Sequence, residues 1–289
     1  MQLSVLIPTH DRTCYPLVST LASQLQASGI SHEVIVADDG SRDQVSVIAN
    51  LKINEIEHCQ YIRNTDNVGR SAIRNQLADK ASGEWLLFID SDAKIVRQDY
   101  ISRYAEVMND ENNVVCGGII HPDVCPSPRQ SLRWTYEKDY ELRNGTISEG
   151  FRSFQFMIRR EVFMQIRFDE RITKYGWEDV LFGIRLREMG LKITCIDNPL
   201  MNDDIERNDV FLRKTEEAIM NLCTFRDELK GDVNLIKTAD MVSGVAWLVR
   251  MAFALTKNMM RRNLLGEKPN MKVLAFYKLG YYLNHCRKP

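Results

Sequence analysis

Trp85-Leu86-Leu87-Phe88-Ile89, followed directly by Asp90-Ser91-Asp92, is the stretch that decides the fold of this 289-residue chain. Five consecutive apolar residues are typical of a strand that is buried on both faces, and such strands occur mainly in parallel sheets. The acidic residues come at the point where this strand ends. The segment therefore predicts a buried strand whose carboxyl end carries a polar site.

The same pattern recurs on both sides of this segment. Short apolar, β-branched runs alternate with amphipathic stretches, and turn residues separate them. This alternation predicts an α/β fold, with a mostly parallel, Rossmann-like central sheet and helices on both of its faces. The expected strands are 3–7, 33–37, 59–62, 85–89, 114–119, 154–158 and 191–196, and the expected helices are 16–27, 44–51, 70–81, 99–108, 131–142, 178–189 and 208–229.

The composition limits the class of protein. With 44% hydrophobic and 27% charged residues, the chain resembles neither a disordered protein nor a repeat array. It contains no apolar run long enough to span a membrane, and its first residues do not form a secretion signal. The seven cysteines are odd in number and none forms a Cys-x-x-Cys pair, which argues against a disulfide framework and a thiolate zinc site. We therefore expect a globular, cytoplasmic protein.

Polar clusters follow each of the first four predicted strands, at residues 8–11, 38–41, 64–69 and 90–92. In a parallel sheet these positions meet at one edge, where ligands bind. Asp90 and Asp92 would point the same way if the segment is extended. Paired carboxylates at such an edge suit Mg²⁺ or Mn²⁺ shared with substrate phosphate oxygens, and the alternative is two solvated loop acids.

Two other clusters each have two interpretations. In Asp38-Asp39-Gly40-Ser41, either Asp39 or Ser41 caps the next helix, or a carboxylate accepts hydrogen bonds from a nucleobase or ribose. In segment 67–75, Arg70 and Arg74 lie one helical turn apart. They either offer donors to an anion at the helix start or form a solvated face.

The segment Tyr175-Gly176-Trp177-Glu178-Asp179 precedes a predicted helix. Acids in a first helical turn are ordinary partners of the helix dipole. Trp177 favours a second interpretation, because an aromatic face beside a carboxylate suits a sugar pocket that contains a general base.

Taken in chain order, these motifs resemble the family 2 inverting glycosyltransferases of the GT-A fold, in particular those that build bacterial polysaccharides. The resemblance runs over residues 3–225. The motifs that carry it are Ser4-Val5-Leu6-Ile7-Pro8-Thr9, Asp38-Asp39-Gly40-Ser41, Asn67-x-Gly69 with Arg74-Asn75, Gly83-Glu84-Trp85 through Asp90-Ser91-Asp92, and Gly176-Trp177-Glu178-Asp179.

The resemblance implies transfer of a sugar from a nucleotide-diphosphate donor, with a UDP-sugar expected, to a glycan or lipid-linked acceptor. Mg²⁺ or Mn²⁺ would be the cofactor, and cell-surface polysaccharide synthesis the setting. The implied roles are donor binding by Pro8, Thr9, Asp11, Asp39, Asn67, Arg70, Asp90 and Ser91, metal binding by Asp90, Asp92 and Asn202, acceptor contact by Gly176 and Trp177, and catalysis by Glu178 and Asp179, with Asp179 as the general base.

One position departs from the family pattern. Relatives often place a His after the last strand, where this chain has Asn202. Asn202 or nearby Asp203 can still offer an oxygen to Mg²⁺. Because of this departure, a second interpretation stays open, in which the protein is a non-catalytic relative that binds nucleotide sugars or glycans. A nucleotidyltransferase would need a Gly-rich loop after the first strand, and residues 8–12 do not form one.

The expected domains are a GT-A domain over residues 1–230, with a nucleotide-binding half (1–120) and an acceptor half (121–230), and a basic amphipathic helical region over 231–289. Residues 243–289 hold nine Lys and Arg and one acid, whereas residues 1–242 carry a net charge of −9. This segregation indicates that the C-terminal stretch meets an anionic partner.

A helical wheel of this stretch has a basic and an apolar face. Arg250, Lys257 and Arg261 share the first, and Trp247, Leu248, Met251, Leu255 and Met259 lie across from them. The pattern predicts a peripheral contact through residues 243–289 with the inner face of a membrane. The alternative is a helix packed on the catalytic domain with a solvated basic face. We expect no nucleic-acid partner, because the chain as a whole is not basic.

Overall fold

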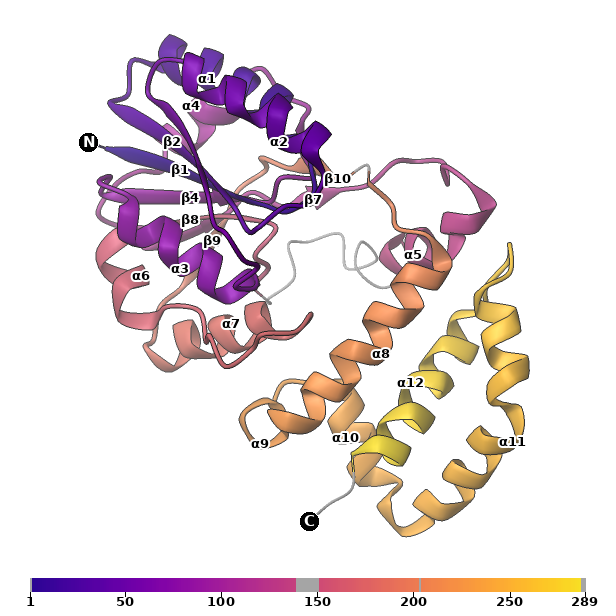
Figure 1. The fold of residues 1–289 in the computed structure, drawn as a ribbon. Helices are drawn as coiled ribbons and strands as arrows, with labels where there is room; N and C mark the ends of the chain where they lie inside the picture. The colour runs from indigo at the N-terminus through magenta and orange to yellow at the C-terminus, as the bar shows by residue number, and fades with distance from the viewer. Residues whose placement is uncertain (1, 139–150, 203, 287–289) are drawn as a thin grey trace. The chain divides into compact units, whose positions relative to one another are not determined.

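The contacts of this chain divide it into two units in a computed structural model, which describes residues 2–138, 151–202 and 204–286 (Figure 1). The first unit comprises residues 1–120, 147–173 and 182–203, and the second comprises 121–146, 174–181 and 204–289. The domain boundaries given above stay a prediction.

A seven-stranded sheet in the order β3-β2-β1-β4-β8-β6-β9 forms the centre of the first unit. Only β8 runs antiparallel to its neighbours, β4 and β6. The prediction of a mostly parallel central sheet is therefore confirmed. The strands are β1 (Leu3–Thr9), β2 (His32–Asp38), β3 (Cys59–Arg63), β4 (Trp85–Ile89), β6 (Val114–Cys116), β8 (Gln155–Arg159) and β9 (Ile193–Cys195).

Helices cover both faces of this sheet and enclose two cores (Figure 1). Because side chains alternate along a strand, Val5 of β1 packs in one core and Leu6 in the other, and both are fully buried. Helices α1 (Tyr15–Ser28) and α4 (Tyr100–Ala105) supply the first core. Helices α3 (Arg70–Lys80), α6 (Arg160–Ile166) and the later turns of α7 (Glu178–Glu188) supply the second. The short helix α2 (Gln44–Leu51) follows β2.

The predicted strand 114–119 is interrupted by two glycines. A Cβ on Gly117 would overlap the Asn198 carbonyl, and Gly118 has a φ of +87°. The chain turns here, so β7 (Ile119–Ile120) leaves the main sheet. It joins β5 (Ala93–Ile95) and β10 (Leu200–Asn202) in a three-stranded sheet.

Helices build the second unit. Leu212, Phe253 and Tyr277 come from three of them and meet in one buried core. A Cβ on Gly280 would overlap the Phe253 ring, so only glycine allows this approach. The predicted helix 208–229 is broken at Phe225, and residues 139–142 of the predicted helix 131–142 lie outside the described residues. The helices are α5 (Ser131–Tyr136), α8 (Asn208–Thr224), α9 (Arg226–Leu229), α10 (Asn234–Met241), α11 (Ala246–Leu264) and α12 (Met271–His285).

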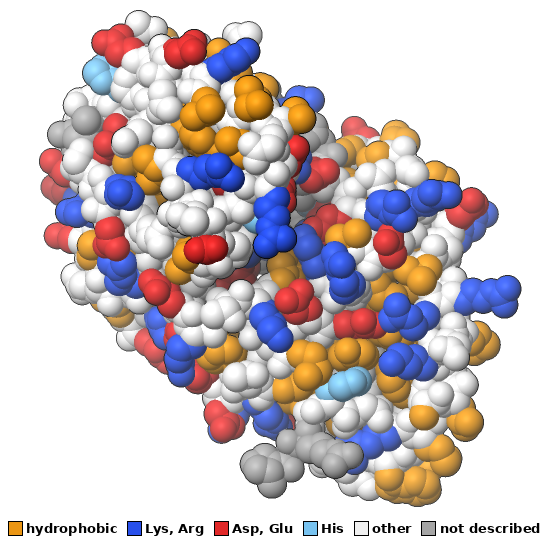
Figure 2. Space-filling model, in the orientation of Figure 1, with side chains coloured by type: hydrophobic (Ala, Val, Ile, Leu, Met, Phe, Trp, Pro, Cys, Tyr) orange, Lys and Arg blue, Asp and Glu red, His pale blue; other side chains and the backbone are white. Residues whose placement is uncertain are grey.

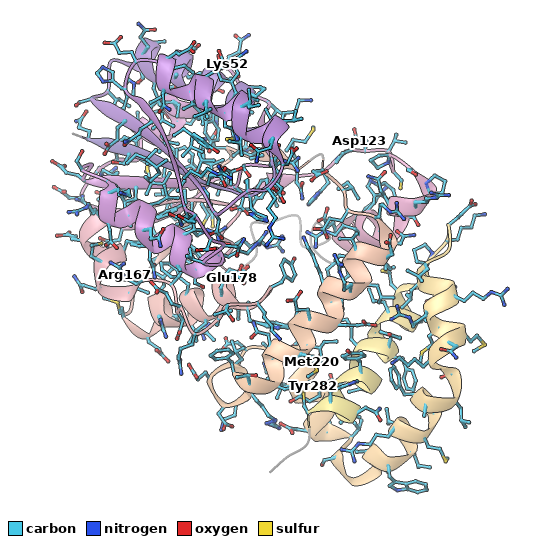
Figure 3. The ribbon with its side chains drawn as sticks, in the orientation of Figure 1. Lys52, Asp123, Arg167, Glu178, Met220 and Tyr282 are labelled. Carbon is cyan, nitrogen blue, oxygen red and sulfur yellow. A yellow bond between two sulfur atoms is a disulfide. The ribbon has the colours of Figure 1, made fainter. Side chains whose placement is uncertain are left out.

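A disulfide joins Cys223, near the end of α8, to Cys286, which follows α12; their Cα atoms are 5.2 Å apart. The same two helices carry Met220 and Tyr282, which lie close together in the view of Figure 3. The expectation that argued against disulfides is wrong for this pair. Cysteine number and spacing report only on neighbours in the sequence, whereas the fold brings together two thiols that are 63 residues apart.

Candidate functional site

Two acids at the end of β2 are held by different hydrogen bonds. Asp38 accepts from the Ser41 backbone N–H (2.7 Å) and from the Tyr61 hydroxyl. Asp39 accepts from the N–H groups of Val68 (2.7 Å) and Gly69 (3.0 Å), directly before α3. Asp39 therefore connects the end of β2 to the start of α3.

Neither of the residues predicted to cap α2 does so. Asp43 is the capping residue, and its carboxylate accepts from the N–H groups of Val45 (3.2 Å) and Ser46 (3.1 Å). Ser41 instead accepts from the Asp11 backbone N–H through its hydroxyl. The prediction that an acidic or hydroxyl side chain caps α2 is correct, but the capping residue is Asp43, four residues beyond Asp39.

The loop after β1 contains the next predicted donor-binding residues. Pro8 and Thr9 end the strand, and Asp11 follows with a φ of +49°. Asp11 Oδ1 accepts from the N–H groups of Arg42 (2.6 Å) and Asp43 (2.8 Å). The Asp43 and Arg42 hydrogen bonds keep the pKa of the Asp11 carboxyl below its ordinary value. Asp11 thus holds the loops after β1 and β2 together.

His10 lies between two of the predicted residues. Its Nδ1 is 2.8 Å from the Asp39 carbonyl oxygen and 3.3 Å from Asn67 Nδ2. The β1–β2 register, in which Thr9 pairs with Asp38, explains this placement. The sequence reasoning did not assign His10 a role, because one histidine in a loop forms no recognisable motif.

Asp90 lies in a turn, so the expectation of an extended Asp90–Asp92 segment is wrong: the Ala93 N–H donates to the Asp90 carbonyl (3.0 Å). Arg74 Nη2 donates to Asp90 Oδ1 at 2.5 Å, and the Arg74 side chain is only 2% exposed. The Phe168 ring lies 5.5 Å from the guanidinium carbon. The solvated-face interpretation is therefore wrong for Arg74, which fixes the first acid of the motif, whereas Arg70 is exposed.

Asp92 is the acid with the most perturbed ionisation in this region. Burial and the neighbouring Asp90 carboxylate raise the pKa of Asp92 to about 6, although Arg12 and Arg70 act to lower it. Ser91 lies in the same turn and is partly exposed. Burial and the Asp90 carboxylate disfavour the ionised form of Asp92, and a bound cation would stabilise that form.

Asn202 lies beside this turn. It pairs with Ala93 across the β5–β10 ladder, so it neighbours the residue that follows Asp92. Asn202 is 7% exposed, and its Oδ1 has no hydrogen-bond partner among the described residues. Leaving such a buried acceptor unsatisfied costs about 1–3 kcal/mol.

Asp92 and Asn202 together offer the hard oxygen ligands that Mg²⁺ or Mn²⁺ prefers, so these residues fit a divalent cation. Within residues 2–138, 151–202 and 204–286, no group of three or more His, Cys, Asp or Glu side chains is placed to hold a metal by itself. The other ligands would come from phosphate oxygens and water. Asp203, the other candidate ligand, lies outside the described residues.

The remaining predicted residues belong to the second unit. Gly176 and Trp177 have φ values of +98° and +77°, so two successive residues are left-handed. Two hydrogen bonds join this turn to α8: Trp177 Nε1 donates to the Ala218 carbonyl (2.6 Å), and Asn221 Nδ2 of α8 donates to the Gly176 carbonyl (2.9 Å). A bulky residue in this conformation costs about 1–3 kcal/mol, and such strain is typical of functional sites.

Glu178 and Asp179 begin α7 directly after this turn (Figure 3). Glu178 is buried, whereas Asp179 is partly exposed and its Oδ1 accepts from the Val180 N–H (2.8 Å). Of the two acids, Asp179 is therefore the one that a substrate reaches more easily.

We expect Gly176→Ala to destabilise the second unit by about 1–3 kcal/mol. The new Cβ would lie 2.9 Å from the Ala218 Cβ, and alanine disfavours a φ of +98°. Urea unfolding measures the loss. Gly190→Ala is the matched control, because Gly190 also has a positive φ (+70°) but nothing lies within 4 Å of its added Cβ. Equal losses in the two variants would contradict the importance of the contact with α8.

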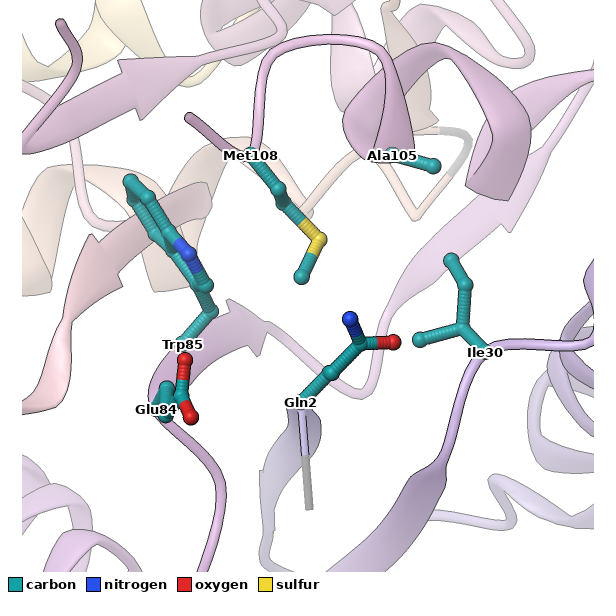
Figure 4. A pocket seen from close by; sticks show the side chains of 6 residues that line it. All are labelled: Gln2, Ile30, Glu84, Trp85, Ala105 and Met108. Carbon is teal, nitrogen blue, oxygen red and sulfur yellow. The ribbon is translucent and has the colours of Figure 1, made fainter. Parts of the chain in front are cut away.

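A small pocket of about 140 Å³ lies elsewhere in the first unit (Figure 4). It is found at the amino ends of β1 and β4, the opposite edge of the sheet from the predicted donor site. Its lining residues are Gln2, Ile30, Glu84, Trp85, Ala105 and Met108. This pocket is therefore separate from the candidate site.

Sequence comparison finds relatives among glycosyltransferases. The chain is 33% identical over 244 residues to the uncharacterized glycosyltransferase YfnE of Bacillus subtilis. This alignment covers 66% of this chain and 62% of YfnE. The chain is 25% identical over 208 residues to the glycosyltransferase AglD of Haloferax volcanii. This alignment covers 67% of this chain and 32% of AglD. The chain therefore spans less than two thirds of the length of each of these relatives.

Solved structures show the same fold. Staphylococcus aureus TarS (residues 1–349) matches 99% of this chain and 90% of its own, with a TM-score of 0.53 at 17% identity. The mannosyltransferase PcManGT from Pyrobaculum calidifontis, in complex with GDP-Man and Mn²⁺, matches 99% of this chain and 85% of its own, with a TM-score of 0.55 at 14% identity. The predicted GT-A fold is confirmed.

The family model described as "Glycosyl transferase family 2" matches residues 4–167, more than half of the chain. This match includes the loops after β1, β2 and β4 and the segment that leads into α3, which carry the predicted donor residues and two of the three predicted metal residues, Asp90 and Asp92; the third, Asn202, lies outside the match. The chain belongs to glycosyl transferase family 2.

Proposed function

We propose that this protein is a metal-dependent inverting glycosyltransferase that moves a sugar from a UDP-sugar to a glycan or lipid-linked acceptor. Family membership supports sugar transfer. Two observations carry the metal-dependent part: the raised pKa of Asp92, and the unsatisfied Oδ1 of Asn202, which pairs in the β5–β10 ladder with Ala93, the residue after Asp92. TarS, a structural neighbour of the same fold, has been crystallised with UDP-GlcNAc, which supports the choice of donor.

The donor site would consist of loops that the chain holds in place through its own hydrogen bonds. Asp39 and Asp11 fix the loops after β2 and β1 by accepting backbone N–H groups. Arg12 and Arg70 act electrostatically on Asp92, so positive charge is available near the proposed diphosphate position. Preorganisation of this kind lowers the cost of ordering on binding.

The chain's own residues would then divide the work of transfer. Arg74 holds Asp90 in one orientation for the donor. Asp179 would accept the proton of the acceptor hydroxyl, and the fixed Trp177 ring would offer an apolar surface to a sugar. Asp92 and Asn202 would hold Mg²⁺ or Mn²⁺, and the positive charge of the ion would offset the negative charge that develops on the leaving diphosphate.

We further propose that the acceptor is part of a cell-surface polysaccharide and that transfer takes place at the cytoplasmic face of a membrane. The basic character of residues 243–289 supports this setting. A second candidate function is a non-catalytic nucleotide-sugar-binding relative. It is favoured by Asn202, which stands where the family resemblance implies a His. Release of UDP from a UDP-sugar in the presence of acceptor separates the two.

We expect UDP to bind in calorimetric titrations and Mn²⁺ to strengthen this binding at least about tenfold, because the cation relieves repulsion between Asp92 and the diphosphate. Asp92→Asn should lose this enhancement. GDP and dTDP serve as competing nucleotides, and Asp123→Asn, at an exposed position, is the control variant. If none of the three nucleotides binds in the presence of Mn²⁺, the proposed function is wrong.

The same variant has an expected effect on stability without metal. The pKa of Asp92 in the folded protein, about 6, is above its ordinary value, so the ionised carboxylate opposes folding above pH 6 and this cost disappears below about pH 4. In chelator-treated protein, Asp92→Asn should therefore gain on the order of 1–3 kcal/mol at pH 7.5 and almost nothing at pH 4. Urea unfolding at both pH values measures this difference, and an equal change at both would contradict it.

A further inference from the structure

Helix α11 has two apolar stripes, and only one of them is packed within the second unit. Phe253, Met260 and Leu264 are buried in a core that also contains residues of α8 and α12. A second stripe faces away from this core and reaches 79% exposure at Leu255 and 62% at Trp247. We call this stripe the outer face of α11. It consists of Trp247, Leu248, Met251, Leu255 and Met259, and exposed Met241 and Val245 precede it in the chain.

The basic residues that the sequence placed opposite these positions make contacts inside the unit. Arg261 donates to Glu216 and to the Tyr277 hydroxyl (2.9 Å). Arg250 Nε donates to the Leu283 carbonyl (2.8 Å), and Lys257 lies over the rings of Phe253 and Tyr281. The alternative of a solvated basic face is therefore wrong for Arg261 and Lys257, which are partly buried, whereas Arg250 is exposed although it donates to α12. These contacts attach α11 to its neighbours and leave the apolar residues outside.

Positive charge nevertheless accompanies the outer face. At 100° per residue, Arg262 lies between Met251 and Leu255 on the helix circumference, and it is exposed. Lys268 and Lys272, in the connection to α12 and at its start, are exposed as well. Glu267 is the only acid from residue 243 onward. Figure 2 shows hydrophobic side chains interspersed with Lys and Arg along the edge where α11 lies.

We propose that the outer face of α11 docks on the surface of a lipid bilayer that contains anionic headgroups. An apolar stripe with a tryptophan at one end and cations beside it is the pattern of a helix that lies in the interface. From Trp247 to Met259 the stripe extends about 18 Å along the helix axis, long enough to lie flat on a membrane. The anionic lipid accounts for the excess of positive charge, which an apolar partner surface would not.

No single helix among the described residues has the length and hydropathy of a membrane span, although α10 and the segment Ser243–Leu264, bent by 62°, meet these criteria as a pair. The proposed contact is peripheral. It extends the proposed function, because a lipid-linked acceptor is found at such a surface, but its support comes from α11 and not from the donor site.

The test is flotation of the full chain with phosphatidylcholine vesicles that contain or lack phosphatidylglycerol. We expect binding to the anionic vesicles only. Trp247→Ser/Leu255→Ser should lower the partition coefficient at least about tenfold, and Arg262→Glu/Lys272→Glu should do the same in low salt. Val45→Ser/Ile48→Ser is the matched control, since Val45 and Ile48 are apolar, 76% and 62% exposed, and on α2 of the first unit.

Absence of vesicle binding by the wild-type chain, or equal binding by Trp247→Ser/Leu255→Ser, would overturn the proposal. So would a dimer in sedimentation equilibrium that the same variant converts to monomers without any vesicle binding, because the outer face would then be covered by a second copy. UDP titration of each variant, without lipid, keeps the two proposals apart. A wild-type chain that binds UDP but not vesicles would contradict only the membrane proposal. A chain that binds vesicles but not UDP would contradict only the proposed function.

Discussion

Asp179→Asn is expected to lower the rate of sugar transfer by about 10²–10⁴-fold and to leave UDP affinity within about twofold. Asparagine has the shape of aspartate but does not accept a proton from the acceptor hydroxyl. Its Oδ1 can still accept the hydrogen bond that the Val180 N–H donates to Asp179, so the start of α7 should keep its structure. The rate of UDP release with acceptor present gives the first quantity, and calorimetric titration with UDP gives the second.

Glu188→Gln is the matched control for this substitution, because Glu188 is an exposed acid at the other end of α7. It should retain wild-type activity. If Asp179→Asn instead abolishes UDP binding, then Asp179 contacts the donor and is not the general base. If Asp179→Asn transfers sugar at the wild-type rate, another group accepts the proton.

Arg74→Met is expected to destabilise the protein by about 3–5 kcal/mol, because it leaves the Asp90 carboxylate without its buried partner. The Arg74 side chain is 2% exposed and donates to Asp90 at 2.5 Å, so little solvent is available to replace it. UDP affinity should also fall, since Asp90 loses its fixed orientation. Urea unfolding measures the first effect and calorimetry the second.

The double variant Arg74→Met/Asp90→Asn keeps this prediction testable if Arg74→Met does not fold. Removing both charges should recover a large part of the lost stability but not the UDP affinity, because the donor contact itself is gone. Arg70→Met is the control, since Arg70 is an exposed arginine on the same helix. A loss of stability in Arg70→Met as large as that in Arg74→Met would show that burial of the ion pair is not the cause.

The sequence predicted the elements of the first unit well, because continuous apolar runs such as 85–89 leave few alternatives to a buried strand. It failed where a contact distant in sequence decides the structure. The run 114–119 is apolar throughout, yet the close approach of Asn198 to Gly117 ends the strand at Cys116. The break at Phe225, unlike the interruption at Gly117 and Gly118, occurs without a glycine or proline at that point of the sequence.

The candidate site was predicted less completely. Residues at strand ends, such as Asp39 and Asp92, were recognisable because topology alone places them at one edge of the sheet. Their partners were not: the burial of Arg74 depends on Phe168 and Asp90, and the unsatisfied oxygen of Asn202 depends on the β5–β10 register. Periodicity gives the face of a helix or strand, but not the distant residue that covers it.

Helix α3 connects two parts of the proposed donor site. The backbone N–H groups just before α3 donate hydrogen bonds to Asp39. One turn into the helix, Arg74 donates to Asp90. Adding a single residue between Gly69 and Arg74 would rotate the guanidinium by about 100° around the axis and carry it away from its acid. Spacing within this first turn therefore matters as much as the identity of the residues, and natural length variation should be tolerated in the loops on either side but not inside it.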